Sequence, residues 1–394
     1  MGAGTAQRGA CLLISGKVRK NMEFVVFAGV LLLLFIFMIV QELIQTKNQE
    51  KLFKKYLREN YGKEPPKEYS LERFARLGSY LERHKEEKQL DDITWNDLGM
   101  DEVFRRIDRT YSAAGEEYLY YTLRNISCGR EALEHLEEVV NWLQEQENIK
   151  VRIQLLMKRL GHLGKYSLYD YLDNLDYLGE RSNRKIVLGN LLYLPFLLLL
   201  FVQPAMGTIG IVLCMLWHIM TYFREKKVIE PYIISFAYVL RLIDVCEELE
   251  KQKIPVYRRE LDELREVLKS LRELRRGAYW VMAGNQGKIG GNPLDILADY
   301  LRMILHLDIF QFNRMLEKLR KKTGQVETML AITGYLDMAI SVGGFRKSLE
   351  GYCIPKLEED TEKAFLHMKK GWHPLLSQPV KNSIRAVSYT HLRA

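Results

Sequence analysis

The residues of this chain that could bind a phosphate group lie in a glycine-rich segment, GNQGKIGGNP, at positions 284–293. A Walker A phosphate loop follows the pattern G-x-x-x-x-G-K-[S/T], in which the last hydroxyl helps to hold Mg²⁺. Met282 and Ile289 stand where that pattern needs its first glycine and its hydroxyl. A second segment, GHLGK at 161–165, is followed by Tyr166. We therefore expect both segments to be turns between helices, and we expect no catalytic residue and no cofactor in this chain.

Two rows of basic side chains are the candidates for binding a polyanion. They consist of Arg265, Lys269, Arg272 and Arg276, and of Arg314, Lys318, Lys321 and Lys322. The spacing of the first row places it on one face of a helix, and such a row could follow the phosphates of a nucleic acid. Four acids are interleaved with it: Asp262, Glu263, Glu266 and Glu273. The alternative is therefore a solvated face on which ion pairs neutralise the basic residues.

The composition favours a helical protein without disulfides. Prolines number only 10, whereas Leu, Glu, Lys and Arg, which favour helices, are abundant. The 5 cysteines contain no C-x-x-C pair and the 8 histidines show no ligand spacing, so neither a disulfide framework nor a metal site is predicted. Lys and Arg total 58 against 50 acids, which gives a formal charge of +8. That excess is compatible with a nucleic acid or an anionic membrane surface as partner.

Long helices are expected to position these side chains. Apolar residues recur at helical spacing over residues 131–160 and again over 261–274, and residues 48–58 and 71–90 have helical composition. A break is predicted at Pro65 and Pro66. No segment before the last twenty residues is predicted to be a strand. The expected fold class is therefore mainly α.

Residues 24–40, FVVFAGVLLLLFIFMIV, contain no charged side chain. As a helix they would extend about 25 Å, close to the shortest length that crosses a hydrocarbon core. No small-residue cleavage site follows them, so an uncleaved transmembrane anchor is predicted rather than a signal peptide. Basic residues lie on both sides of the segment, and its orientation stays open.

A second apolar block, residues 186–223, is too long for one span and has a natural break at QPAMG, residues 203–207. We predict a transmembrane helical hairpin, with Asn190 and His218 at the ends away from the turn. Tyr193, Trp217 and Tyr222 suit the membrane–water interface. The basic segments RSNRK and REKK flank the hairpin, so the positive-inside rule places both flanking domains in the cytoplasm.

The segment DRTYSAAGEEYLYYTLRN, residues 108–125, resembles the segment that opens the helical core of the MutS family of DNA mismatch-repair ATPases. The matching positions are Asp108, Thr110, Ser112, Gly115, Leu119 and Leu123. Ser112 is suited to cap the helix that follows, with Glu116 close by. Gly115 is suited to a close contact between helices.

Two later segments are similar to the same family. Residues 330–357 resemble the stretch that links the core helices to the ATPase domain, with Leu336, Asp337 and residues 352–355 as matching points. GWHPLL and PVKNSI resemble the strand that enters that domain. Its matching positions are His373, Pro374, Leu375, Val380 and Asn382.

The resemblance implies a DNA-binding protein that uses ATP and Mg²⁺ and forms a homodimer through its ATPase domain. A Walker A loop is expected to follow PVKNSI, but the chain continues as RAVSYTHLRA. We therefore expect a fragment whose last ten residues are not native and which does not hydrolyse ATP alone. A membrane anchor stands in place of the family's mismatch-reading domain, and the apolar hairpin stands where the family has its DNA clamp.

The expected organisation has eight segments: a basic N-terminal segment (1–23), an anchor (24–40), a helical linker (41–91), the first part of the core (92–185), a transmembrane hairpin (186–223), the second part of the core with the lever helices (224–366), the start of an ATPase domain (367–384) and a non-native tail (385–394). The functional hypothesis is a membrane-anchored MutS-like protein that binds DNA. The alternative is a membrane-tethered helical scaffold or lever that acts on a protein or lipid partner without binding DNA.

Overall fold

The computed structural model describes residues 36–41, 43–63, 69–86, 88–126, 129–164, 166–275, 293–358, 365–376 and 378–387. Most of the predicted anchor, the break at Pro65 and Pro66, and residues 284–292 lie outside these ranges. The chain divides into two units, one of residues 1–56 and 287–301 and the other of residues 57–286 and 302–394. In the first unit, residues 36–41 and 43–56 are helical. All sites discussed below lie in the second unit.

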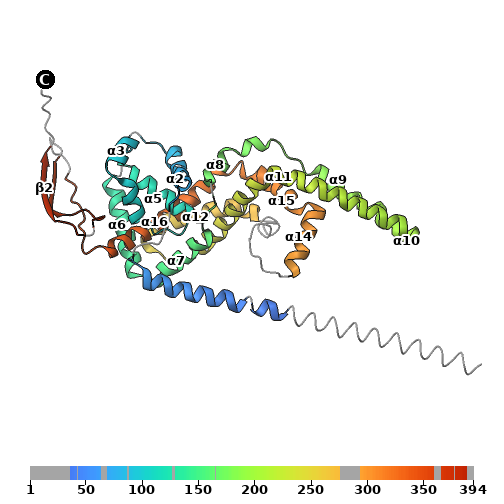
Figure 1. The fold of residues 1–394 in the computed structure, drawn as a ribbon, viewed down its shortest axis with the longest axis horizontal. Coiled ribbons are helices and arrows are strands. Elements are labelled where there is room, and N and C mark those ends of the chain that lie inside the picture. Colours follow the sequence, from blue (N-terminus) through green and yellow to red (C-terminus); the bar gives the residue numbers. More distant parts are fainter. Residues whose placement is uncertain are drawn as a thin grey trace, which may run out of the picture. The chain divides into compact units, whose positions relative to one another are not determined.

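The described part of the protein is mainly helical, with one two-stranded sheet. Before the apolar hairpin the helices are α2 (Leu71–Arg83), α3 (Asp92–Asp97), α4 (Met100–Ile107), α5 (Ala113–Arg124), α6 (Arg130–Glu145), α7 (Glu147–Leu160) and α8 (Leu168–Asp173). From the hairpin onward they are α9 (Arg184–Leu191), α10 (Tyr193–Val202), α11 (Pro204–Glu250), α12 (Arg258–Leu271), α14 (Pro293–Leu305), α15 (Leu307–Leu319) and α16 (Thr323–Ser348). Figure 1 shows their order along the chain.

The core of the second unit is built around α16. This helix packs against α5, α6, α7, α11 and α12, and its most apolar stretch is 72% buried. Helices α5 and α16 approach closely because each has a glycine at the contact. A Cβ on Gly334 would lie 2.6 Å from the Ala114 carbonyl oxygen, and one on Gly115 would lie 2.4 Å from an Asp337 carboxylate oxygen. The close packing predicted for Gly115 is confirmed.

Helix α11 is the longest element, with 47 residues, and at 1.5 Å per residue it extends about 70 Å. Its first half pairs with α10 (Figure 1), whereas its second half packs against α7, α12 and α16. Residues of the second half such as Phe236, Val245 and Leu249 are fully buried. One continuous helix therefore joins the apolar hairpin to the core.

Two of the segments expected to be helical differ in extent from the observed helices. The apolar run over residues 131–160 forms two helices, α6 and α7, that meet at Gln146. The polar stretch around Gln146 interrupts the apolar stripe, and each half turns its own apolar face to the core. Helix α2 stops at Arg83 instead of continuing to residue 90, because the chain from there pairs with the segment after α5 through a Gln89–Asn125 bridge. The predicted helix over residues 261–274 is confirmed as α12 and the short 3₁₀ helix η3 (Arg272–Arg275).

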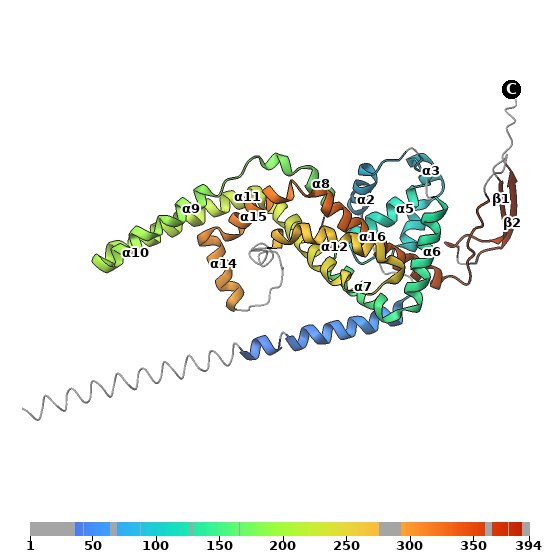
Figure 2. The same ribbon diagram turned by 180° about the vertical axis from the view of Figure 1, so that it is seen from behind.

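Strands β1 (Phe365–Gly371) and β2 (Asn382–Val387) form an antiparallel pair (Figure 2), with Phe365 opposite Val387 and Gly371 opposite Asn382. The expectation of no strand before the last twenty residues is wrong for β1. Its sequence, FLHMKKG, contains no β-branched residue, so its own propensity for a strand is low. Pairing with β2, which could not be predicted locally, makes it a strand.

Candidate functional site

The apolar hairpin is formed by α9 and α10 lying antiparallel to the first half of α11, and Gln203 makes the turn. The buried positions on this half of α11 recur every three or four residues: Gly207, Gly210, Cys214 and His218. A Cβ on Gly207 would lie 2.6 Å from the backbone nitrogen of Leu200, and one on Gly210 would lie 2.1 Å from the ring of Phe196. Small residues let two helices approach in this way where no hydrophobic effect drives their association.

In the described part of the chain, the outer faces of the hairpin are apolar and exposed. Phe201 is 89% exposed, Leu198 69% and Met220 67%. Among the described residues three helices are long and apolar enough to cross a membrane: Arg184–Val202, α11 and α16. The apolar stretch of Arg184–Val202 is only 6% buried, whereas that of α16 is mostly enclosed by the core. The predicted hairpin is therefore confirmed in its helical form, and its surface is suited to lipid.

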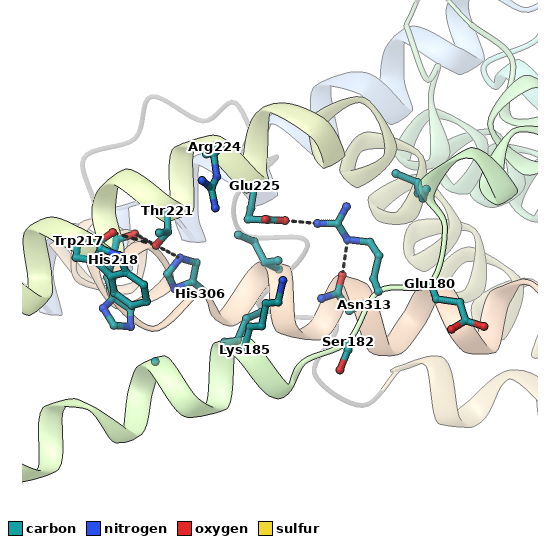
Figure 3. Close-up of a pocket in the computed structure, with 15 residues that line it drawn as sticks. Glu180, Ser182, Lys185, Trp217, His218, Thr221, Arg224, Glu225, His306 and Asn313 are labelled. Carbon is teal, nitrogen blue, oxygen red and sulfur yellow. Dashed lines mark hydrogen bonds and ion pairs between the residues drawn. The ribbon is translucent and has the colours of Figure 1, made fainter.

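A cavity of about 440 Å³ lies at the base of the hairpin, at the end away from the turn. The loop before α9, α9 itself, α11 and the start of α15 all contribute to its lining (Figure 3). On one side, Arg181 forms an ion pair with Glu225, and its Nε donates a hydrogen bond to Asn313 Oδ1 at 3.1 Å. These contacts fix the loop that leads into α9 against α11 and α15.

Two histidines line the other side of the cavity. The rings of His218 and His306 are 5.3 Å apart, and 1% and 5% of their surfaces are exposed. Burial, together with the neighbouring His218, lowers the pKa of His306 to about 4, so His306 is neutral at physiological pH. His306 Nε2 lies 3.3 Å from the Thr221 hydroxyl, while its Nδ1 has no hydrogen-bond partner among the described residues. At this cavity, a buried polar atom is thus left without a partner from the residues that the structure describes.

Two polar residues at the base of the hairpin face the protein interior. Asn190 donates a hydrogen bond to the Leu305 carbonyl at 3.1 Å. The Tyr222 hydroxyl donates to Asp308 at 2.8 Å, and Tyr222 is buried. Tyr222 was predicted to suit a membrane–water interface, and the structure shows that its hydroxyl satisfies a buried carboxylate. Trp217 is half exposed beside the cavity, as expected of an interfacial residue.

The motif residues near the start of α5 meet Asp337 of α16, although more than two hundred residues separate them in sequence. Asp337 is 1% exposed. Its carboxylate accepts hydrogen bonds from Tyr111 N at 3.0 Å, from Ser112 N at 2.8 Å and from the Ser112 hydroxyl at 2.6 Å. Ser112 also accepts from Gly115 N at 3.1 Å, so its predicted role as the helix cap is confirmed. We name this group the α5–α16 junction.

The segment before the junction is held by further buried groups. Thr110 donates to Asp108 Oδ1 from its backbone nitrogen at 2.9 Å and from its hydroxyl at 2.6 Å. Ser341 of α16 accepts from Arg109 N at 2.7 Å and donates to the Ile107 carbonyl at 2.8 Å. The chain from Ile107 to Ser112 is thereby fixed to α16 at two points.

Two neighbouring glutamates of α5 connect it to other elements. Glu116 pairs with Arg73 and Arg76 of α2. Glu117 accepts a hydrogen bond from the Ser167 hydroxyl at 2.9 Å, and burial raises its pKa to about 8. Because Glu116 is fully buried and paired with arginines, removing it would leave positive charges without a partner in the core.

Ion pairs neutralise part of the first basic row. Arg265 pairs with Glu250 at 2.6 Å and with Asp262 at 2.8 Å, and Lys269 pairs with Glu266 at 2.6 Å. Arg272 is exposed, and the structure gives it no ion pair with a described residue. Arg276 lies outside the described residues.

The second row begins on α15, where Arg314 is exposed and Lys318 is half buried. The structure brings the two rows together: the Lys322 ammonium group donates to the Ser270 carbonyl, and α15 contacts η3. Contact between the rows could not be read from their spacing.

The remaining motif residues lie in and next to the β1–β2 hairpin. His373 and Pro374 lie in the connection between the strands, and His373 Nδ1 accepts from Leu375 N at 3.3 Å. Asn382 begins β2. The segment GWHPLL was expected to enter an ATPase domain as a strand. Apart from Gly371, which ends β1, its residues connect the two strands instead. Residues 385–387, assigned to the tail, belong to β2, and residues 388–394 lie outside the described ranges.

Sequence reasoning did not find the cavity at the base of the hairpin. The basic segments RSNRK and REKK were signals for it, but they were interpreted only as indicators of membrane topology. His306 gave no signal, since only the fold brings α15 against α11. No protein-family model, curated protein or solved structure matches this chain, and its function must therefore be inferred from its own residues.

Proposed function

We propose that this chain is the membrane-attached helical lever of a MutS-like protein. The observation that carries the proposal is α11, which is lipid-compatible over its first half and part of the packed core over its second half. The helix is continuous through Pro231, and we expect it to transmit a rotation or shift of the core to the membrane, or the reverse. The first half has the length of a membrane span, and its outer face is exposed within the part of the chain that the structure describes.

The α5–α16 junction supports the family assignment within this proposal. The residues that carry the resemblance, Ser112, Gly115 and Asp337, form one buried contact. In the complete protein a following ATPase domain would bind ATP and Mg²⁺ and form the homodimer. The basic ends of the hairpin would lie in the cytoplasm with the core, by the positive-inside rule.

Spin labels along α11 test the membrane assignment. The full chain is studied in lipid nanodiscs. Oxygen is expected to accelerate the spin relaxation of labels at Leu213 and Met220, because these exposed side chains face lipid. For labels at Lys227 and Lys251, a water-soluble nickel complex is expected to accelerate the spin relaxation instead. A label at Tyr177, which is 86% exposed outside the hairpin, is the water-accessible control. If the nickel complex accelerates the relaxation of the Leu213 label as much as that of the Tyr177 label, a membrane span is excluded.

Nucleic-acid binding is the second candidate function, favoured by the meeting of the two basic rows. Three exposed cations in these rows make no ion pair with a described residue: Arg272, Arg314 and Lys321. They are free to neutralise phosphates, whereas Arg265 and Lys269 are already paired. Without such binding, the lever would act on a protein or lipid partner.

Salt titration of DNA binding separates these two functions. For the full chain in nanodiscs of neutral lipid, log K against log[salt] for duplex or branched DNA is expected to fall steeply. Each phosphate contact contributes about 0.9 to the slope, so replacing Arg272, Arg314 and Lys321 by Gln should reduce it by about 2 to 3. The matched control replaces three exposed lysines of the β hairpin: Lys369, Lys370 and Lys381. No binding at low salt, or equal losses in both triple variants, would contradict the nucleic-acid function.

A further inference from the structure

Within the described part of the chain, the cavity at the base of the hairpin has cationic side chains without an ion pair. Lys185 from α9 and Arg224 from α11 both line it, and neither has an ion pair with a described residue. Figure 3 shows the Lys185 side chain extending from α9 toward α11. Arg181, the third cation, is occupied by Glu225, and Glu180 is the other carboxylate at the rim. Because α9 and α11 run antiparallel here, two free cations from different helices converge on one space.

The position of the cavity decides which anion suits it. It lies where the basic flanks meet the apolar hairpin, which is the level of the lipid headgroups if the hairpin spans the bilayer. Trp217 and Ile186 line the cavity, and Leu213 and Met220 form an exposed apolar surface along α11. An occupant with a phosphate at one end and acyl chains at the other would satisfy both environments.

We propose that this cavity binds the phosphate-bearing headgroup of an anionic phospholipid, with Lys185 and Arg224 as its cationic contacts. The unpaired Nδ1 of His306 supplies a further polar group at the same cavity. Basic pockets between transmembrane helices on the cytoplasmic side are typical sites for such headgroups. The acyl chains lie against the hairpin. The inference rests on the membrane attachment proposed above and gives the lever a specific lipid ligand.

Lipid binding to the purified full chain in mild detergent tests the proposal. The probes are short-chain phosphatidic acid, phosphatidylglycerol and phosphatidylcholine, together with inorganic phosphate, and the readout is Kd from native mass spectrometry or calorimetry. The Lys185→Gln/Arg224→Gln variant is expected to bind the two anionic lipids about thirtyfold more weakly, since each Lys or Arg near an anionic lipid contributes about fivefold. Phosphatidylcholine is expected to bind the unmodified chain weakly and to be insensitive to the variant.

Arg184 and Lys227 provide the matched control. Arg184 adjoins Lys185 in sequence, and Lys227 lies three residues after Arg224 on α11. Both are exposed, and neither lines the cavity. Arg184→Gln/Lys227→Gln changes the charge equally and is expected to weaken binding by less than about threefold. Equal losses in the two double variants would mean a general surface attraction and would overturn the site. Inorganic phosphate binding as tightly as phosphatidic acid, with the same sensitivity, would mean a free-anion site and would overturn the lipid assignment.

Failure of this inference is distinguishable from failure of the proposed function. Both double variants leave the apolar faces of the hairpin intact, so they are expected to insert into neutral vesicles like the unmodified chain. If insertion occurs and Lys185 and Arg224 are irrelevant to lipid binding, only the headgroup site is wrong. If the unmodified chain does not insert at all, the membrane-attached lever itself is wrong.

Discussion

Release from the membrane is expected when the apolar hairpin is removed. In a chain that starts at residue 41, replacing residues 186–223 with a short Gly-Ser loop should move the protein from the carbonate-washed membrane pellet to the supernatant. Each apolar side chain in a membrane span contributes about 0.3–0.6 kcal/mol to insertion, so the exposed leucines, isoleucines and phenylalanines of two arms sum to several kcal/mol. The chain with the hairpin and the chain without it both start at residue 41, so both lack the predicted anchor. Any difference between them is therefore due to the hairpin.

The fold makes this deletion feasible. Arg181 before α9 pairs with Glu225 on α11, so the two ends that the loop must join already lie side by side. The core half of α11, from Ile229 to Leu249, keeps its partners in α7, α12 and α16. Circular dichroism with a single cooperative unfolding transition is the control that the shortened chain is folded. If the chain from residue 41 with its hairpin intact is also found in the supernatant, the hairpin does not anchor the protein.

Loss of the Asp337 carboxylate is expected to cost about 3 kcal/mol or more of the free energy of unfolding. Asp337→Ala leaves the buried backbone N–H groups of Tyr111 and Ser112 without an acceptor, and each unsatisfied buried donor costs about 1–3 kcal/mol. The measurement is urea unfolding of the full chain in mild detergent, followed by circular dichroism. Hydrogen exchange supplies the local readout: the amides of Tyr111 and Ser112 should exchange much faster.

Two variants make the result specific to the junction. Asp337→Asn keeps one oxygen acceptor and nearly the same volume, so it should lose less stability than Asp337→Ala. Asp97→Ala removes an exposed carboxylate at the end of α3, and surface changes of this kind usually stay within about 0.5 kcal/mol. Equal stability of Asp337→Ala and Asp97→Ala would show that the α5–α16 junction does not hold the two helices together.

Local sequence pattern was enough to predict the helical character and the hairpin. A run of apolar residues with a single break at QPAMG leaves few alternatives to two paired helices, since no face of either arm is polar. The stripe Leu261, Leu264, Leu268 and Leu271 predicted α12, because its period matches that of a helix. Ser112 was identified as a cap from its place before a helix. These features depend on neighbours in sequence, and neighbours in sequence are what periodicity and capping rules describe.

Long-range contacts account for what was missed. The sequence of β1 carries a weak strand signal, and β2 supplies its partner. The split of residues 131–160 at Gln146 follows from two helices each turning an apolar face to the same core. The ion pairs of Arg265 and Lys269 with acids on the same face were foreseen as an alternative, but Glu250, a partner from the end of α11, was not.

The sequence by itself determined that this protein is a helical chain with a lipid-compatible hairpin flanked by basic residues, because burial and membrane insertion follow from the order of apolar and polar side chains. Only the tertiary structure decided that Ser112 meets Asp337, that the two basic rows adjoin, and that Lys185, Arg224 and His306 surround one cavity. These groups come from helices far apart in the chain. Their meeting depends on how the core packs around α11 and α16, and no local pattern encodes that packing.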